Sequence, residues 1–189
     1  MSGDASYIAR VATHGSSLGW PIVRFFYDCE FIEDGVTIEL ISIGVVDERG
    51  REYYAVSTEF DPQRAGEWVR AHVLPKLPAP ADKAWRSRAA IQDTLLEFLT
   101  APGERVELWA WFAAYDHVAL AQLWGPMPAL PKALPRFTRD LRQRWEDAGK
   151  PALPPPPSDA HDAVADARYN LTRWRVIEQH RMAQQSRLR

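Results

Sequence analysis

The feature that most constrains this chain is an apolar run that ends in two acids. Residues 22–27 read Ile-Val-Arg-Phe-Phe-Tyr and are followed by Asp28-Cys29-Glu30. The β-branched and aromatic composition predicts a buried strand, and an unpaired charge at such a place is costly. Because alternate residues of a strand share a face, we expect Asp28 and Glu30 to point toward one place and Cys29 away from it. Two converging carboxylates suit a divalent magnesium or manganese ion.

Two later segments carry the remaining residues of a candidate metal site. A strand-like run, 105–112, leads into Asp116, and a proline-rich stretch, 150–158, leads into His161 and Asp166. Taken singly, each motif is weak: a chain of this size is expected to hold about one Asp-x-Glu by chance. His161 also reads as a surface histidine, and Asp166 as an acid that stabilises the first turn of a helix. Only the set of four acids and one histidine indicates a site.

Composition limits the class of protein. A length of 189 residues predicts one domain with a substantial core. The net charge of −2 argues against a protein that binds a long stretch of nucleic-acid backbone. It still allows binding of a few nucleotides, such as the end of a nucleic-acid chain. Cys29 is the only cysteine, which excludes an internal disulfide and agrees with a cytoplasmic location. No apolar stretch has transmembrane length, so we expect no membrane partner.

Hydrophobic periodicity predicts an α/β fold with a mixed β-sheet flanked by helices. We expect the first three strands to form an antiparallel meander, with the first of them central, and later strands to add in parallel. The strands are expected over residues 23–28, 37–47, 52–57 and 105–112. Helices are expected over residues 67–73, 88–99, 116–124, 138–148 (capped by Thr138) and 162–179.

The same reading divides the chain into three parts. Residues 1–21 are expected to be a disordered N-terminal extension, 22–180 the folded domain and 181–189 a basic C-terminal tail.

The third motif needs a geometric check. In a continuous helix, side chains five residues apart lie about 140° apart around the axis, so His161 and Asp166 would not easily serve one site. The prolines before residue 158 prevent a helix there. We therefore expect His161 in the loop before the helix, Asp159 or Asp162 as the N-cap, and Asp166 in the first turns.

Four carboxylates and a histidine form a set with a known use. Two divalent ions about 3.5–4 Å apart can clamp the attacking and leaving oxygens of a phosphoryl displacement. A neutral histidine can then take the proton from the attacking water.

In motif order and spacing, residues 22–180 resemble the DEDDh family of 3′-5′ exonucleases. Asp28 and Glu30 match the first motif, Asp116 the second, and His161 with Asp166 the third, which reads His-x-Ala-x-x-Asp. The wording around these motifs, such as Phe-Tyr-Asp-Cys-Glu-Phe-Ile-Glu-Asp-Gly, is similar to an actinobacterial branch, the polyadenylate-specific 3′-exoribonucleases (RNase AS). The resemblance implies an RNase H-like fold and two Mg²⁺ ions, or Mn²⁺. It also implies release of nucleoside 5′-monophosphates from the adenylate-rich 3′ ends of single-stranded RNA, and a homodimer.

The chain departs from the broad family at one place. Many DEDDh enzymes carry asparagine four residues before the second-motif acid, where this chain has Phe112. Aromatic rings could instead stack on a base, worth about 1–3 kcal/mol per base, and Phe31 and Trp111 are our candidates. The alternative is that Trp111 belongs to the strand core.

Arg139 lies in a series of arginines spaced by three, with Arg136 and Arg142. It is a candidate contact to the RNA backbone. Neighbouring acids make a solvated ion-pair face the alternative.

Two other functions remain open at this stage. The fold could serve as a non-catalytic RNA- or nucleotide-binding module, since fold does not guarantee function. The same chemistry could also act on DNA or short oligonucleotides. Competition between RNA and DNA would separate these, because only RNA carries 2′-hydroxyls.

Overall fold

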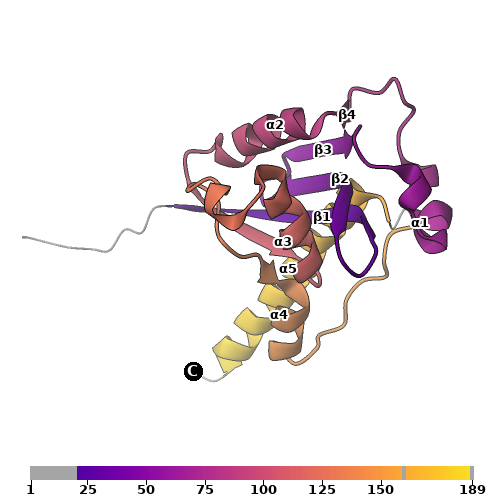
Figure 1. Ribbon diagram of the computed structural model, residues 1–189. Helices are drawn as coiled ribbons and strands as arrows, with labels where there is room; N and C mark the ends of the chain where they lie inside the picture. The colour runs from indigo at the N-terminus through magenta and orange to yellow at the C-terminus, as the bar shows by residue number, and fades with distance from the viewer. Residues whose placement is uncertain (1–20, 159–160, 188–189) are drawn as a thin grey trace, which may run out of the picture.

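The structure, a computed structural model, describes residues 21–158 and 161–187. The disordered extension predicted for residues 1–21 lies, except for Pro21, outside this range. Within it a six-stranded mixed sheet, ordered β4-β3-β2-β1-β5-β6, is flanked by helices (Figure 1). The strands are β1 (Ile22–Glu33), β2 (Ile38–Asp47), β3 (Glu52–Ser57), β4 (Trp85–Arg86), β5 (Arg105–Ala110) and β6 (Arg139–Asp140).

The pairing confirms the predicted topology. Strands β1, β2 and β3 form an antiparallel meander, and β5 joins β1 in parallel, so β1 lies near the centre of the sheet. Two short strands that the sequence reading missed, β4 and β6, add in parallel to β3 and β5. Both contain only two residues, which is too short to show a period.

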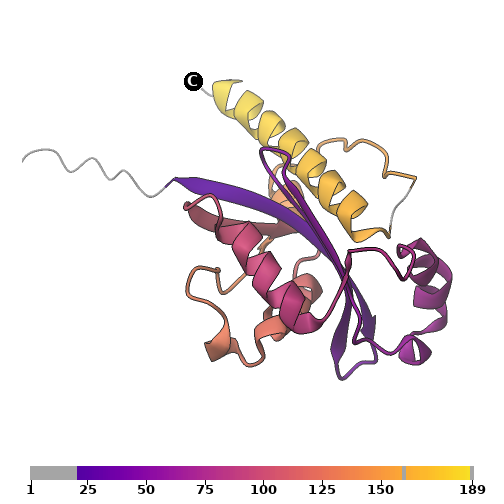
Figure 2. The ribbon, with the colours of Figure 1, turned by 90° about the horizontal axis from the view of Figure 1, so that it is seen from above.

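Helices cover both faces of the sheet. Helix α5 crosses one face and α2 lies on the other, as Figure 2 shows from above. The helices are α1 (Glu67–His72), α2 (Arg88–Thr100), α3 (Ala114–Ala121), α4 (Leu141–Asp147) and α5 (Ala163–Arg187). Four short 3₁₀ turns lie at Pro62–Arg64, Leu74–Lys76, Gln122–Trp124 and Met127–Ala129. None of the helices among the described residues is long and apolar enough to span a membrane.

The first strand is buried on both faces, which explains its continuous apolar sequence. Phe25 and Tyr27 pack in one core cluster with Leu95 of α2. Phe26 points to the other face and packs with Leu171 of α5. The strand therefore serves as the rigid base from which Asp28 and Glu30 project.

The predicted strand over 105–112 was two residues too long. Strand β5 ends at Ala110, and Phe112 adopts a left-handed backbone conformation with φ of 57°. The N–H of Ala113 donates to the Asp140 carboxylate at 2.9 Å, which fixes this turn just before α3. The apolar sequence Trp111-Phe112 resembled strand continuation, but this contact with a distant residue ends the strand.

The helix predicted over 138–148 begins later, at Leu141. Its N-cap is Asp140, whose Oδ1 accepts from the N–H groups of Arg142 and Gln143 at 2.7 and 3.1 Å, so the assignment of Thr138 as cap was wrong. The Thr138 hydroxyl instead lies 2.6 Å from the Tyr27 hydroxyl.

The final helix is longer than predicted. Helix α5 continues to Arg187, into the segment that the sequence reading assigned to a basic tail.

Candidate active site

Strand β1 supplies the first two acids. Asp28 and Glu30 both line a cleft of about 620 Å³, while Cys29 is buried in the core. The register of β1 against β2 shifts between Glu30 and Phe31, so the strand bends directly after the second acid. The spacing of two residues thus places both carboxylates in one cleft, as predicted.

Asp116 reaches this cleft from the first turn of α3. Parallel pairing of β5 with β1 ends at Phe26 and Trp109, so the edge of β1 beyond this point is free of β5. The N–H of Cys29 donates to Asp116 Oδ1 at 2.8 Å across that edge. One hydrogen bond therefore fixes the carboxylate of a helix next to the acids of a strand.

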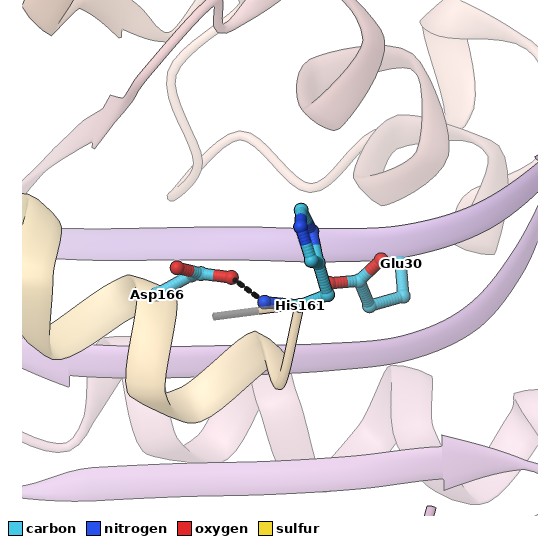
Figure 3. Close-up of side chains that lie close together, drawn as sticks. All are labelled: Glu30, His161 and Asp166. Atoms are coloured by element: carbon cyan, nitrogen blue, oxygen red, sulfur yellow. Dashed lines mark hydrogen bonds between the residues drawn. The ribbon is translucent and has the colours of Figure 1, made fainter. Parts of the chain in front are cut away.

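Asp166 and His161 come from the start of α5. Asp162 caps the helix, since its Oδ1 accepts from the N–H groups of Val164 and Ala165 at 3.1 and 3.0 Å. His161 lies in the preceding loop with φ of 70°, and its N–H donates to Asp166 Oδ2 at 2.6 Å (Figure 3). The predicted placement of His161 before the helix and Asp166 within its first turns is confirmed.

A glycine allows α5 to approach the sheet. Gly44 of β2 pairs with Asp28 of β1. A Cβ built on Gly44 would overlap the backbone of Ala163 and Val164, so the first turn of α5 lies directly on β2. Only glycine permits such contact, and this contact holds the first turn of α5, which carries Asp166, against the strand that pairs with Asp28.

Part of the cluster has the geometry of a metal site. Ligand atoms of Glu30, His161 and Asp166 lie within 4.8 Å of one another (Figure 3). Asp28 and Asp116 line the same cleft. Hard carboxylate oxygens are the donors that Mg²⁺ and Mn²⁺ prefer, so the acids of the cleft suit such ions.

The electrostatics of the acids point in the same direction. Burial, followed by repulsion from the neighbouring carboxylates, raises the pKa of Asp28 well above its usual value and that of Glu30 to about 7. Burial raises the pKa of Asp116 to about 7, although the Cys29 N–H partly offsets this. Burial also raises the pKa of Asp166, against the opposing effect of the His161 N–H. A bound cation would favour the ionised carboxylates and so lower these raised pKa values.

These shifts predict how pH affects the stability of the metal-free protein. The folded protein retains protons on Glu30 and Asp116 up to a pH of about 7, whereas the unfolded chain releases them near pH 4. Stability without metal should therefore fall as the pH rises from about 4 to 7 and stay low above it. Cations compete with these protons, so stabilisation by Mg²⁺ should grow over the same interval.

Thermal unfolding with Mg²⁺ or with a chelator, at pH 5.5 and pH 8, measures this effect. A free ion concentration of 100 times the dissociation constant adds about 2.7 kcal/mol to the free energy of unfolding. For a chain of this size, that raises the unfolding temperature by about 5–10 °C. We expect that shift at pH 8 and a much smaller one at pH 5.5. Equal shifts at both pH values would contradict the assignment of these acids as ligands.

Aromatic side chains line the rest of the cleft. Phe31 stacks on Tyr115 with ring centroids 5.8 Å apart, and the His161 ring meets Trp68 edge-on at 4.7 Å. Phe112 is 59% exposed despite its strained backbone. Exposed rings beside a carboxylate cluster are suited to stacking on nucleobases.

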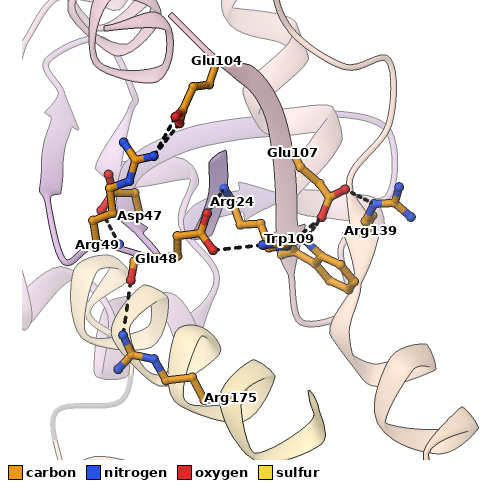
Figure 4. Close-up of polar contacts among 9 residues, drawn as sticks. All are labelled: Arg24, Asp47, Glu48, Arg49, Glu104, Glu107, Trp109, Arg139 and Arg175. Carbon is orange, nitrogen blue, oxygen red and sulfur yellow. Dashed lines mark hydrogen bonds and ion pairs between the residues drawn. The ribbon is translucent and has the colours of Figure 1, made fainter. Parts of the chain in front are cut away.

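The predicted substrate contacts divide into two groups. Phe31 and Trp111 line the cleft, as a base-stacking role requires. Arg139 does not line it: its Nε lies 3.0 Å from Glu107 Oε2, in an ion-pair network that includes Arg24 (Figure 4). The ion-pair interpretation of Arg139 therefore matches its contacts better than the backbone-binding one.

Sequence reasoning missed several residues of the cleft, of which Trp68 and Arg173 bear most directly on its chemistry. Trp68 lies on α1, far from the motifs, and nothing in the sequence marked it. Arg173 could have been found, because it follows Asp166 by seven residues and so lies on the same face of α5.

Comparisons with known proteins find a matching family model and a relative of high sequence identity. Residues 23–178 match the family model described as the 3′-5′ exoribonuclease Rv2179c-like domain. The chain is 69% identical over 156 residues to the 3′-5′ exoribonuclease Rv2179c of Mycobacterium tuberculosis (strain ATCC 25618 / H37Rv), with 82% of this chain and 93% of the relative covered.

Solved structures share the fold at low sequence identity. The nuclease domain of 3′hExo, described as a DEDDh family member bound to rAMP, superposes with a TM-score of 0.55 at 11% identity, covering 89% of this chain and 94% of that one. Cell-death related nuclease 4 (CRN-4) superposes with a TM-score of 0.50 at 14% identity, covering 83% of this chain and 64% of that one. These neighbours confirm the predicted RNase H-like fold. By family model and by sequence identity, the chain belongs to the Rv2179c-like 3′-5′ exoribonuclease domain family.

Proposed function

We propose that this protein is a metal-dependent 3′-5′ exoribonuclease that releases nucleoside 5′-monophosphates from single-stranded RNA. One observation carries the proposal: residues from β1, α3 and the start of α5 place four acids and one histidine in one cleft. These residues are Asp28, Glu30, Asp116, His161 and Asp166. The name of the M. tuberculosis relative, 3′-5′ exoribonuclease, supports the same reaction and direction.

The acids and the histidine have different roles in this proposal. Asp28, Glu30, Asp116 and Asp166 would hold two divalent ions, Mg²⁺ or Mn²⁺. Bound there, such ions would neutralise charge on the scissile phosphate and lower the pKa of the attacking water. His161 accepts the proton of that water, because its ring faces the cleft from a loop and is held edge-on by Trp68 at 4.7 Å.

The preference for adenylate, the homodimer and the cytoplasmic location belong to the same proposal. The first two are supported by the resemblance to the polyadenylate-specific branch, and the last by the single, buried cysteine. Phe31 and Trp111 are the rings that we assign to base contacts.

A digestion series on four homopolymeric RNAs tests this function. With Mg²⁺ we expect stepwise shortening of oligoadenylate from its 3′ end, AMP as product and slower digestion of the other three polymers. A chelator should stop the reaction. A block at the RNA 3′ end should also stop it, whereas an endonuclease would still cut.

The same assay separates the two alternatives. Binding of oligoadenylate without cleavage, in the presence of Mg²⁺, would mean a non-catalytic binding module. Faster digestion of a matched DNA strand would mean a DNA-directed enzyme.

A further inference from the structure

Arg173 is a cation inside a cleft of carboxylates. It lies two turns beyond Asp166 on the same face of α5 and lines the cleft together with Asp28 and Asp166. Its charge lowers the pKa of both of these acids, although burial of each acid, and for Asp28 also repulsion from other carboxylates, still raises the pKa. The guanidinium therefore acts on the site electrostatically, and as a lining residue it borders the space of the cleft.

The guanidinium is held in a fixed orientation. Its central carbon lies 4.1 Å from the ring centroid of Trp111 and 4.0 Å from that of Tyr169. Nη1 donates to Asn170 Oδ1 at 2.8 Å, and Asn170, fully buried, donates through Nδ2 to the Tyr27 carbonyl at 3.0 Å. This chain of contacts connects Arg173 to the backbone of β1 next to Asp28.

Other arginines of α5 differ from Arg173. Arg168 forms an ion pair with Glu52 at 2.6 Å, and Arg181 one with Glu178 at 3.5 Å. Among ion pairs between described residues, none includes Arg173, and its Nε is buried without a hydrogen-bond partner. Burial lowers the pKa of this guanidinium, and the charges of Asp28 and Asp166, which lie beyond ion-pair distance, offset only part of that effect. The two rings offset a further part of the cost of burial. A function for the charge would explain why the chain retains it.

We propose that Arg173 binds a phosphodiester oxygen of the RNA substrate in the cleft. The rings of Trp111 and Tyr169 lie against its central carbon, Nε is buried, and Nη1 donates to Asn170. The guanidinium can therefore meet a ligand through its remaining N–H groups, which phosphate oxygens accept. The acids repel the RNA backbone, and Arg173 supplies a positive charge that remains when no metal is bound. This inference rests on the proposed function, since it names a contact to that substrate.

Binding of RNA without hydrolysis tests the inference. Fluorescence anisotropy would follow a 5′-labelled oligoadenylate with a free 3′ end, with Ca²⁺ in place of Mg²⁺ to prevent turnover, over a series of KCl concentrations. The variants are Arg173→Gln and Arg173→Lys. The matched control is Arg175→Gln, on the same helix but exposed, where Nη2 donates to the Glu48 carbonyl at 3.4 Å (Figure 4).

We expect Arg173→Gln to weaken binding on the order of tenfold or more. The slope of log affinity against log salt should become shallower by about 0.7, the loss of one phosphate contact to a single strand. Arg173→Lys should retain the slope but bind more weakly than wild type, because it keeps the charge and loses the planar fork. Arg175→Gln should change neither quantity.

A purely structural role gives a different result. Thermal unfolding of Arg173→Gln would then show lower stability, while affinity and salt slope of the folded protein would match wild type, and the inference would be overturned. Wild-type protein that fails to bind oligoadenylate at all would overturn the proposed function as well.

Discussion

Asp28→Asn is expected to reduce the rate of RNA digestion about 10³-fold or more while the protein remains folded. Loss of a ligand that holds the ions in place should cost about 4 kcal/mol of transition-state stabilisation, which corresponds to that factor. Asparagine keeps the shape and one oxygen but removes the charge, so the change tests the charge alone. Initial rates on oligoadenylate at saturating Mg²⁺ measure it.

The stability of the same variant should change in the opposite direction. In the wild type, burial and repulsion from Asp116 and Glu30 raise the pKa of Asp28 well above its usual value, so this carboxyl group destabilises the metal-free fold at neutral and alkaline pH. Asp28→Asn removes this repulsion, and its unfolding temperature in chelator should rise by about 2–4 °C per kcal/mol relieved. Stabilisation by Mg²⁺ should shrink or vanish.

A matched control separates the site from general surface charge. Asp93→Asn changes an exposed acid of α2, on the face of the sheet opposite α5, and should leave activity and the Mg²⁺ shift unchanged. Wild-type activity in Asp28→Asn would contradict the assignment of the cleft as the catalytic centre.

The second large effect is expected for Gly44→Ala. The added methyl group would overlap the backbone of Ala163 and Val164, so α5 must move away from β2. Overpacking of this kind typically costs about 1–3 kcal/mol, and a shift of about 1 Å in catalytic groups can cost about 10²-fold in rate. Both stability and activity should therefore fall, because the displaced turn carries Asp166.

Gly66→Ala is the control for Gly44→Ala. Gly66 has φ of −65°, and a Cβ there meets no atom within 4 Å, so alanine should leave the stability near that of the wild type. Because Gly66 lines the cleft, this variant is a control for stability and not for rate. Denaturant unfolding measures both variants, and initial rates measure Gly44→Ala. Wild-type rate and stability in Gly44→Ala would contradict the claim that close contact between α5 and β2 positions His161 and Asp166.

Prediction of the fold from sequence succeeded where the pattern is local. Strand β3 was placed with its observed bounds, and α2 to within one residue at its end, because alternation and helical spacing report directly on these elements. Errors occurred where a distant contact decides the boundary. Strand β5 ends early because Asp140 holds the N–H of Ala113, and Asp140 also replaces Thr138 as the cap of α4.

The same distinction applies to the candidate site. The sequence by itself determined which five residues we assign to it, because their identity, order and motif spacing are properties of the chain. Only the tertiary structure decided how they meet: Gly44 admits the first turn of α5, the Cys29 N–H fixes Asp116, and Trp111 with Tyr169 holds Arg173 beside the acids. Periodicity records which face a residue takes within its own element, but approach between elements depends on side-chain volume and hydrogen bonds across long sequence separations, which no local pattern contains.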